Sequence, residues 1–196
     1  MISFPLYDVE RNMPPAGLRI RAARESDLPE LQAVRVAAFA PVFASFRSIL
    51  GDAIYDVAQA PDDEAQAAIL PACFEASSVW RLYAADISDR IVAFLSYRVD
   101  EDAGIGAIGL NAVHPEYGGL GIGSALYDFA LDRMSEAGAS VATVATGADP
   151  SHTPARRAYA KAGFNVEIPS VWLCCDLRER TATSDGVPSP LGVPSH

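Results

Sequence analysis

Positive charge is scarce in this sequence. The 196 residues include 15 Lys and Arg against 25 Asp and Glu, which gives a formal net charge of −10 at pH 7. General binding of nucleic acid needs a basic surface, so this composition argues against a nucleic-acid partner. It also means that an anionic cofactor must be held by local backbone amides and a few cations, not by the overall field.

Cysteine, long apolar runs and a leader sequence are scarce or missing as well. The three cysteines, Cys73, Cys174 and Cys175, show no metal-binding spacing, and we expect each to be a buried, reduced thiol. No apolar run approaches the ~20 residues of a membrane span. The first residues also lack the basic region and apolar stretch of a signal peptide. These features predict a cytoplasmic protein with no metal site and no membrane partner.

The hydrophobic content is high enough for one globular domain, since half of the residues are apolar. Residues 1–17 contain Pro5, Pro14 and Pro15 without a clear period, and we interpret them as an N-terminal extension. Residues 178–196 are rich in Ser, Thr, Pro and Gly and predict a flexible C-terminal tail. The folded domain is therefore expected to span residues 18–177.

Within this domain, strand-like and helix-like patterns follow one another. Strands are expected at residues 18–22, 79–85, 90–99, 105–113, 140–146 and 171–177, and helices at 28–38, 62–76, 122–137 and 154–162. Pro41 should interrupt the first helix or restart its pattern, and the acidic residues 62–64 should lie in solvent at the start of the second. Residues 86–89 predict a hairpin turn.

A glycine-rich loop precedes the third of these helices. It runs from Gly118 to Gly123, and the apolar residues behind it fall on one face of a helix that Gly138 can end. Glycines allow close backbone approach, and the first amides of a helix lack partners within the helix. Together with the positive end of the helix dipole, these amides form an anion site suited to phosphates.

Two common phosphate-binding motifs do not fit this chain. A P-loop requires Gly-Lys-Ser/Thr at the end of its loop, and no Lys stands there. A dinucleotide fingerprint occurs as the string from Gly104 to Gly109, but Pro115 follows soon after and no helix opens on it. We therefore expect those glycines to lie within or beside a strand, and an NAD-dependent oxidoreductase is disfavoured.

The loop and a second motif resemble the GCN5-related N-acetyltransferase (GNAT) family. Val113-x-Pro115 and the loop are similar to its acetyl-coenzyme A motif Gln/Arg-x-x-Gly-x-Gly/Ala, with Gly118 in place of the Gln or Arg. Residues 152–164 resemble its later motif Asn-x-x-Ala-x-x-x-Tyr-x-Lys-x-Gly-Phe, with His152 in place of the Asn. The resemblance covers nearly the whole folded domain. It implies an α/β fold in which helices flank a central mixed, mostly antiparallel sheet.

The resemblance also implies acetyl-coenzyme A as co-substrate and an amine as acceptor, either a small molecule or a peptide. The strand before the loop would contact the cofactor through its backbone, the loop would bind the pyrophosphate, and the second motif would complete the site. The residues so assigned are Leu110, Ala112, Val113, Gly118, Gly119, Leu120, Gly121, Ile122, Gly123, Ser124, His152 and Ala155. Residues 39–46 would border the acceptor pocket, although Phe39, Phe43 and Phe46 also suit core packing. A homodimer is compatible with the family.

The chemistry needs a group that takes a proton from the amine and a donor for the departing thiolate. By resemblance, Tyr159 stands at the position of the general acid, and a phenol of pKa ~10 stays protonated at neutral pH. The strand before the loop carries no acid that could serve as base. His114, Glu116 and His152 are nearby in the sequence, which does not choose among them.

These patterns leave two kinds of function open. The first is an N-acetyltransferase that works by direct attack of the amine on the thioester. The second is a module that binds or senses acyl-coenzyme A with little catalysis, which the departures at Gly118 and His152 and the missing strand acid would favour.

Overall fold

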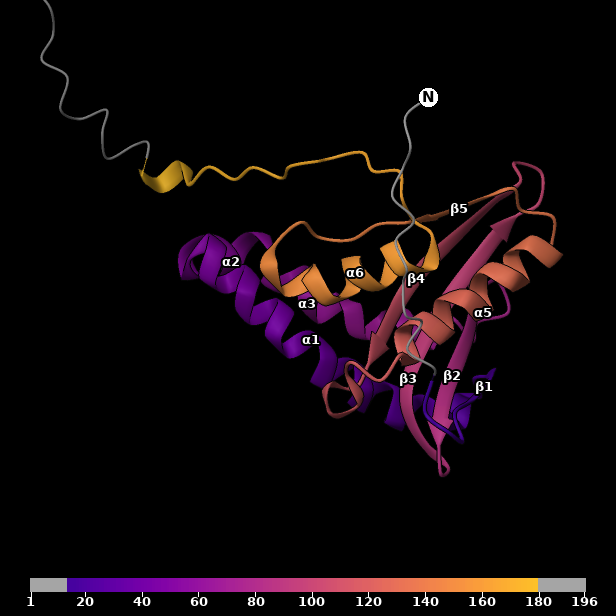
Figure 1. Cartoon of the computed structure of the whole chain (residues 1–196). Coiled ribbons are helices and arrows are strands. Elements are labelled where there is room, and N and C mark those ends of the chain that lie inside the picture. Colours follow the sequence, from indigo (N-terminus) through magenta and orange to yellow (C-terminus); the bar gives the residue numbers. More distant parts are fainter. Residues whose placement is uncertain (1–13, 180–196) are drawn as a thin grey trace, which may run out of the picture.

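The computed structural model describes residues 14–179, so most of the expected N-terminal extension and nearly all of the expected tail lie outside it. A five-stranded sheet in the order β1-β2-β3-β4-β5 forms its centre (Figure 1). The strands are β1 Arg19–Ala22, β2 Arg81–Ile87, β3 Arg90–Asp100, β4 Ile105–Val113 and β5 Val141–Val144. Neighbours from β1 to β4 are antiparallel, whereas β4 and β5 are parallel. The expected mixed, mostly antiparallel sheet is confirmed.

The hairpin between β2 and β3 lies within the predicted turn. Ser88 and Asp89 form its two-residue connection with φ of +51° and +62°. Two positive φ values in succession match the turn twist that suits a right-handed strand pair. This local geometry fixes the register in which β2 faces β3.

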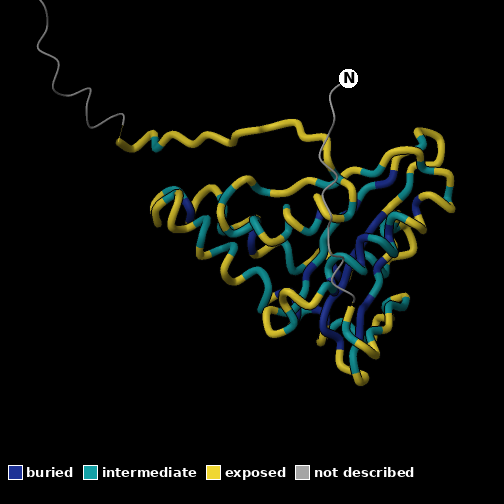
Figure 2. Tube along the Cα trace, viewed as in Figure 1, coloured by how far each residue is buried: buried dark blue, intermediate teal, exposed yellow. Residues whose placement is uncertain are grey.

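Helices cover both faces of the sheet (Figure 1). One face carries α1 Leu28–Leu50, α2 Asp52–Ala58, α3 Ala60–Ala65 and α4 Ile69–Ala72, and the other carries α5 Ile122–Glu136 and α6 Thr153–Ala162. Short 3₁₀ turns, η1 Glu25–Asp27, η2 Gln66–Ala68, η3 Pro115–Tyr117 and η4 Pro150–His152, connect or precede them. Successive β3 residues serve the two layers in turn: Phe94 packs with Leu31 of α1, and Leu95 packs with Leu126 of α5. Figure 2 shows the buried residues concentrated along these strands.

The first two predicted helices differ from the structure. Pro41 lies inside α1, which continues to Leu50, so the expected interruption is wrong. Residues 62–76 do not form one helix but the series α3, η2 and α4. Contacts with α1 explain the break, because Gln32 donates to the Ala67 carbonyl at 2.7 Å and Arg35 donates to the Gln66 side chain at 3.2 Å.

The end of the described chain contradicts a second group of expectations. Residues 171–177 form no strand, and their apolar side chains are exposed, with Val171 at 85% and Leu173 at 85%. Cys174 and Cys175 are exposed as well, contrary to the expected buried thiols. Strand-forming residues need a partner strand to pair with, and among residues 14–179 nothing pairs with this segment, which Figure 2 shows as an exposed run. β5, the neighbouring edge strand, is also shorter and less buried than predicted.

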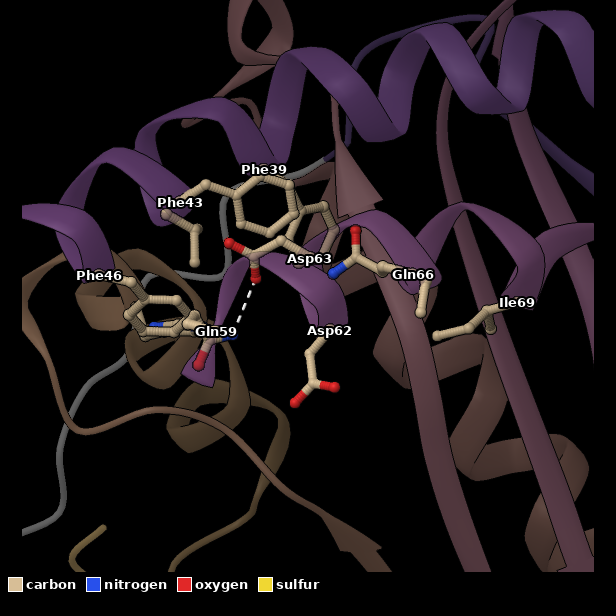
Figure 3. A pocket seen from close by; sticks show the side chains of 11 residues that line it. Phe39, Phe43, Phe46, Gln59, Asp62, Asp63, Gln66 and Ile69 are labelled. Atoms are coloured by element: carbon tan, nitrogen blue, oxygen red, sulfur yellow. Dashed lines mark hydrogen bonds between the residues drawn. The ribbon is translucent and has the colours of Figure 1, made fainter. Parts of the chain in front are cut away.

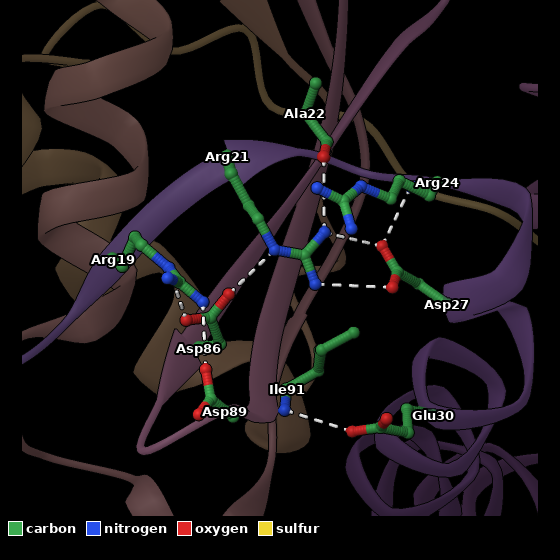
Figure 4. Close-up of polar contacts among 9 residues, drawn as sticks. All are labelled: Arg19, Arg21, Ala22, Arg24, Asp27, Glu30, Asp86, Asp89 and Ile91. Atoms are coloured by element: carbon green, nitrogen blue, oxygen red, sulfur yellow. Dashed lines mark hydrogen bonds and ion pairs between the residues drawn. The ribbon is translucent and has the colours of Figure 1, made fainter.

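A charged cluster fastens β1 to the rest of the sheet (Figure 4). Asp86 of β2 is almost fully buried and accepts from the Nε atoms of Arg19 at 2.9 Å and Arg21 at 2.8 Å. Arg21 also donates to Asp27 at 2.6 Å, and Asp27 accepts from the Arg24 amide at 2.8 Å. The hydrogen bond from Arg21 lowers the pKa of Asp27. The start of α1 is thereby tied to the short first strand.

Helix α1 also changes the expectation about apolar runs. The segment 25–50 is long and apolar enough, by length and composition, to cross a membrane, contrary to the expectation that no apolar run approaches a membrane span. Such a helix is weak evidence of a span, because core helices pass the same test. Leu31 and Val34 of this helix are fully or almost fully buried in the core with the strands.

Candidate active site

Strand β5 pairs in parallel with only the first part of β4. Four residue pairs join them, from Ile105 with Val141 to Ile108 with Val144. Beyond Ile108, residues 109–113 of β4 have no strand partner on this side among residues 14–179. Backbone groups along this half of β4 are therefore available to a ligand or to side chains.

The glycine loop lies at the end of this open half of β4, connected to it by η3. Gly119 and Gly121 adopt φ of +77° and +78°, a region that other residues rarely occupy. Gly121 is the N-cap of α5 and supplies no side-chain cap, and the first turn of α5 contains no acidic residue. The first amides of the helix are thus left for an anion, and no negative side chain opposes it.

The assigned cofactor residues differ in how they could contact a ligand. Ile122 is buried in the core, so only its backbone could take part, whereas Leu120 is exposed. Ala112 packs toward α1, and the Leu110 carbonyl accepts from the Ser96 hydroxyl at 3.0 Å. The structure brings the open half of β4 and the loop 118–124 together, since only His114 and η3 separate them.

Tyr159 belongs to a buried polar network beside the open half of β4. Its ring is 6% exposed, and its hydroxyl lies 3.0 Å from the Nδ2 of Asn111. The Oδ1 of Asn111 also accepts from the Tyr127 hydroxyl at 2.9 Å, and its Nδ2 donates to the Gly109 carbonyl at 3.0 Å. Burial, with the neighbouring Tyr159 hydroxyl, raises the pKa of Tyr127 well above its ordinary value. The Tyr127 phenol therefore remains a protonated donor at neutral pH.

Asn111 of β4 is the polar residue at the centre of this network. It links both tyrosines, and a polar residue within an apolar strand was the signal for such a role. The glycines near it were correctly placed in a strand, because Gly106 and Gly109 lie in β4. A Cβ on Gly109 would lie 2.6 Å from the Trp80 ring and 2.7 Å from the Ser96 hydroxyl.

His152, the N-cap of α6, forms a pair with Asp149 in the preceding loop. The His152 Nδ1 lies 2.5 Å from Asp149 Oδ1, and the ring stacks on Phe46 of α1 with centroids 5.7 Å apart. The other carboxylate oxygen accepts from the Ser151 amide at 3.0 Å, from the Ser151 hydroxyl and from the Ser45 hydroxyl at 3.2 Å. Burial alone would raise the pKa of Asp149, but the bonds from Ser151 and His152 outweigh it and lower the pKa.

A cavity of about 390 Å³ lies between α1, α3 and this loop (Figure 3). Aromatic side chains of α1, acidic and amide side chains of α3 and η2, and the His152 ring line it. The main residues are Phe39, Phe43, Phe46, Gln59, Asp62, Asp63, Gln66 and His152. The sequence left core packing and an acceptor pocket as alternatives for the three phenylalanines, and in the structure they border a cavity.

The acids of α3 correct another expectation. Asp63 is buried rather than solvated, and it accepts from the Tyr55 hydroxyl at 2.6 Å and from the Gln59 side chain at 2.8 Å. The bond to Asp63 raises the pKa of Tyr55. Asp62 is exposed at the cavity edge. Two carboxyl groups therefore face or border the apolar cavity.

The other two candidate bases lie elsewhere. His114 and Glu116 belong to the η3 turn, where the His114 Nδ1 accepts from the Glu116 amide at 3.3 Å. The Glu116 carboxylate lies 3.8 Å from Arg90. Neither residue lines the cavity. Within residues 14–179, no three His, Cys, Asp or Glu side chains gather closely enough to hold a metal ion.

Solved structures support the same fold. An aminoglycoside acetyltransferase from an uncultured soil metagenomic sample, in complex with sisomicin, is 19% identical with a TM-score of 0.52, covering 82% of this chain and 97% of that one. A GNAT family acetyltransferase from Brucella melitensis, in complex with acetyl-CoA, is 20% identical with a TM-score of 0.51, covering 82% and 96%. AAC(6')-Iy in complex with a CoA bisubstrate analogue is 13% identical with a TM-score of 0.55, covering 81% and 98%.

The sequence itself gives the family. No curated protein sequence matches the chain significantly. The model of the acetyltransferase (GNAT) family matches residues 44–164, which include the cavity aromatics at Phe46, the glycine loop and Tyr159. Because this match covers more than half of the chain, the protein belongs to the GNAT family of acetyltransferases, enzymes that use acetyl-coenzyme A as co-substrate.

Proposed function

We propose that this acetyltransferase moves the acetyl group of acetyl-coenzyme A directly to a primary amine of a small cationic molecule. The observation that carries the proposal is that the second motif, with its loop and α6, borders both the cavity and the open half of β4. The second motif supplies His152 to the wall of the acidic, aromatic cavity and Tyr159 to the open half of β4. An acceptor in the cavity and a thioester beside β4 would then meet along α6.

The cofactor half rests on the glycine loop and β4. Pyrophosphate would lie against residues 119–124, where the positive-φ glycines allow close backbone approach and the uncapped start of α5 leaves helix amides for an anion. The pantetheine arm would follow residues 109–113, where β4 has no partner strand on the β5 side among residues 14–179. The chain's net charge of −10 does not help an anionic ligand, so these local groups must provide the affinity.

The acceptor half rests on the chemistry of the cavity. Carboxylates of Asp62 and Asp63 attract an ammonium group, and the faces of the phenylalanine rings interact favourably with cations. The cavity volume of about 390 Å³ suits a small molecule. Fold relatives crystallised with sisomicin and with a CoA–acetylneamine analogue bind ligands of this amine-rich kind.

Tyr159 is our proposed general acid. Its hydroxyl lies beside the part of β4 that is open to the cofactor, and Asn111 fixes its position. A phenol there can deliver a proton to the departing thiolate and regain one from water. Removing the hydroxyl should lower kcat by about 10²-fold while leaving the affinity for acetyl-coenzyme A within about twofold.

The test combines calorimetry with a panel of amines. Tyr159→Phe is compared with Tyr127→Phe, which removes the hydroxyl of a similarly buried tyrosine from the same network. Turnover is followed by loss of thioester absorbance, because the exposed Cys174 and Cys175 would react with thiol reagents. Equal effects of the two substitutions on kcat would remove Tyr159 as the acid. Tight binding of acetyl-coenzyme A without turnover of any amine would remove the catalytic proposal.

The second candidate, an acyl-coenzyme A binding or sensing module, is favoured by one observation. Tyr159 is a buried residue and its hydroxyl is already bonded to Asn111, as expected for a structural tyrosine. In a sensing module, Tyr159→Phe would lower the free energy of unfolding and leave any slow thioester hydrolysis unchanged. The calorimetry and the turnover assay above therefore separate the two functions.

We further propose that the chain forms a homodimer in the cytoplasm. The exposed apolar residues of the segment 166–173 support self-association, since large exposed apolar stretches commonly mark interfaces. Light scattering on the full chain should give twice the chain mass, and a double variant Val171→Asp/Leu173→Asp should shift it to the monomer. A monomeric full chain at micromolar concentration would end this proposal.

A further inference from the structure

The proposed function lacks a group that takes the proton from the amine, and the cavity wall contains a candidate. We infer that His152, held by Asp149, accepts the proton of the acceptor amine at its Nε2 atom. This inference rests on the proposed function, and it concerns a position at which the family motif has Asn instead of His. Of the three residues that the sequence left open, only His152 lines the cavity.

The hydrogen bonds around Asp149 decide which nitrogen of His152 is basic. The carboxylate lies 2.5 Å from Nδ1, and its lowered pKa keeps it an acceptor at neutral pH. The proton of neutral His152 therefore resides on Nδ1, which leaves the lone pair on Nε2. No residue in the range 14–179 hydrogen-bonds Nε2, and the ring forms part of the cavity wall.

Contacts from three elements hold the ring in this orientation. Phe46 of α1 stacks on it, with an angle of 28° between the ring planes. Arg156 of α6 donates to the carbonyls of Gly147 at 2.5 Å and Asp149 at 2.9 Å, and so fixes the loop. A Cβ on Gly147 would lie 2.6 Å from the His152 Nδ1, so the loop fits around the pair only with glycine there.

The spacing along α6 fits the two proposed proton-transfer groups. Tyr159 lies seven positions after His152, which corresponds to about two helical turns, or ~10 Å, on one face of the helix. The path from the base to the acid through the reacting atoms has a similar length. It consists of a hydrogen bond of about 3 Å at each end and, between them, the N–C and C–S bonds of the reacting atoms. Ala155, three positions after His152, belongs to α6 between them and packs against the core cluster that includes Tyr159.

The proton balance of the step is then complete. The bound ammonium loses one proton to Nε2, and this proton passes to bulk water. The nitrogen lone pair attacks the thioester carbon, which forms the C–N bond and breaks the C–S bond, whose electron pair leaves on sulfur. Nε2 takes the second nitrogen proton and then releases it to water, and the sulfur receives one proton from Tyr159, which regains it from water, so that each turnover releases one proton.

The charged groups around His152 come from three elements: Asp149 from the loop, Arg156 from α6, and Asp62 and Asp63 from α3 across the cavity. The α1 side chains in contact with the pair are the uncharged Ser45 and Phe46. Protonation of Nε2 at low pH removes the lone pair. The rate should therefore fall on the acid side of its pH profile because of this residue.

The first experiment measures kcat and kcat/KM from pH 6 to 9 with sisomicin and spermidine as probe amines. His152→Gln should lower kcat by about 10²- to 10³-fold and abolish the acid limb of the profile. The affinity for acetyl-coenzyme A, measured by calorimetry, should stay within about twofold. His114→Gln, a histidine outside the cavity, is the matched control and should keep both the rate and the limb.

The second experiment tests the positioning role of Asp149 without turnover. Nitrogen-15 NMR of the free protein should show His152 as the Nδ1–H tautomer, with assignment from the His152→Gln spectrum. Asp149→Asn keeps the shape of the side chain but can donate to Nδ1, and it should shift the tautomer toward Nε2–H and lower kcat by about 10-fold or more.

Three results would overturn the inference. The first is an unchanged kcat and pH profile in His152→Gln while the wild type is active. The second is a wild-type His152 that carries its proton on Nε2. The third is a loss of acetyl-coenzyme A affinity that accounts for the whole defect, which would assign His152 to the cofactor, as its place in the family motif implies. A wild type that binds acetyl-coenzyme A but acetylates neither probe nor any amine of the panel would overturn the proposed function, and this role with it.

Discussion

Gly118 offers a gain-of-function test of the cofactor site. The family motif has Gln or Arg at this position, and the structure shows that the backbone there accepts such a residue. Its φ of −64° and ψ of 146° are extended values open to any side chain, and the residue is exposed. We predict that Gly118→Arg binds acetyl-coenzyme A more tightly than the wild type.

The expected gain is modest, because the added charge would act in solvent. A Cβ on Gly118 would lie 3.1 Å from the Pro115 carbonyl oxygen, a tight contact that a small backbone shift relieves. A hydrogen bond to a charged group contributes about 1.5–3 kcal/mol when favourably placed. Exposed ion pairs contribute only about 0.2–1 kcal/mol. We therefore expect about 1 kcal/mol, which corresponds to roughly fivefold in Kd.

Calorimetry with coenzyme A at low and high NaCl provides the assay. The gain of Gly118→Arg should shrink with salt because of screening, whereas Gly118→Gln should give about twofold without salt dependence. Gly118→Ala controls for the backbone effect of replacing glycine, and Gly118→Glu controls for the sign of the charge. Equal affinities for the Arg, Ala and Glu variants would refute the placement of the cofactor phosphates at this loop.

Three further predictions concern stability. The pKa of Asp27 is lowered by Arg21, so the stability that Asp27 contributes is present above the ordinary pKa of about 3.9 and is lost as pH falls through the lower folded pKa. Urea unfolding should therefore show that the unfolding free energy of Asp27→Asn depends less on acid pH than that of the wild type. An equal pH dependence in both proteins would contradict the cluster. Leu126→Ala removes an almost fully buried side chain of α5 and should cost about 2–5 kcal/mol of unfolding free energy, with a cost below 1 kcal/mol arguing against this packing. Gly109→Ala should lower the midpoint of thermal unfolding by placing a methyl group against Trp80 and Ser96, whereas Gly123→Ala, whose Cβ would make ordinary contacts at 3.8 Å or more, should keep or raise it.

Local patterns located most of the elements that carry the site. The limits of β4 were predicted as residues 105–113, and Gly138 and Gly163 end or follow α5 and α6 with φ of +87° and +106°. Such signals work within a few residues, since glycine, proline and side-chain alternation act on the backbone where they stand. The glycine loop and the Tyr159 motif were recognisable for the same reason.

The errors arose where a distant element decides the local structure. The bonds from α1 to Ala67 and Gln66 break the helix expected after residue 62, and residues 171–177, which have no partner strand within the described range 14–179, stay out of the sheet. The buried state of Asp63 depends on Tyr55. None of these contacts affects the sequence periodicity of the segment itself, so the pattern could not predict them.

By itself, therefore, the sequence determined the family and the glycine loop, because both depend on residue types at short spacing, and the resemblance to the family implied the mixed sheet. Only the tertiary structure decided the candidate acceptor site. Phe46 and Ser45 from α1 meet His152 and Asp149 more than a hundred residues later, since Ser45 and Asp149 are 104 positions apart. Tyr159 likewise meets Asn111 across 48 positions. Contacts of this range depend on how helices pack on a sheet, which no local preference of the chain specifies.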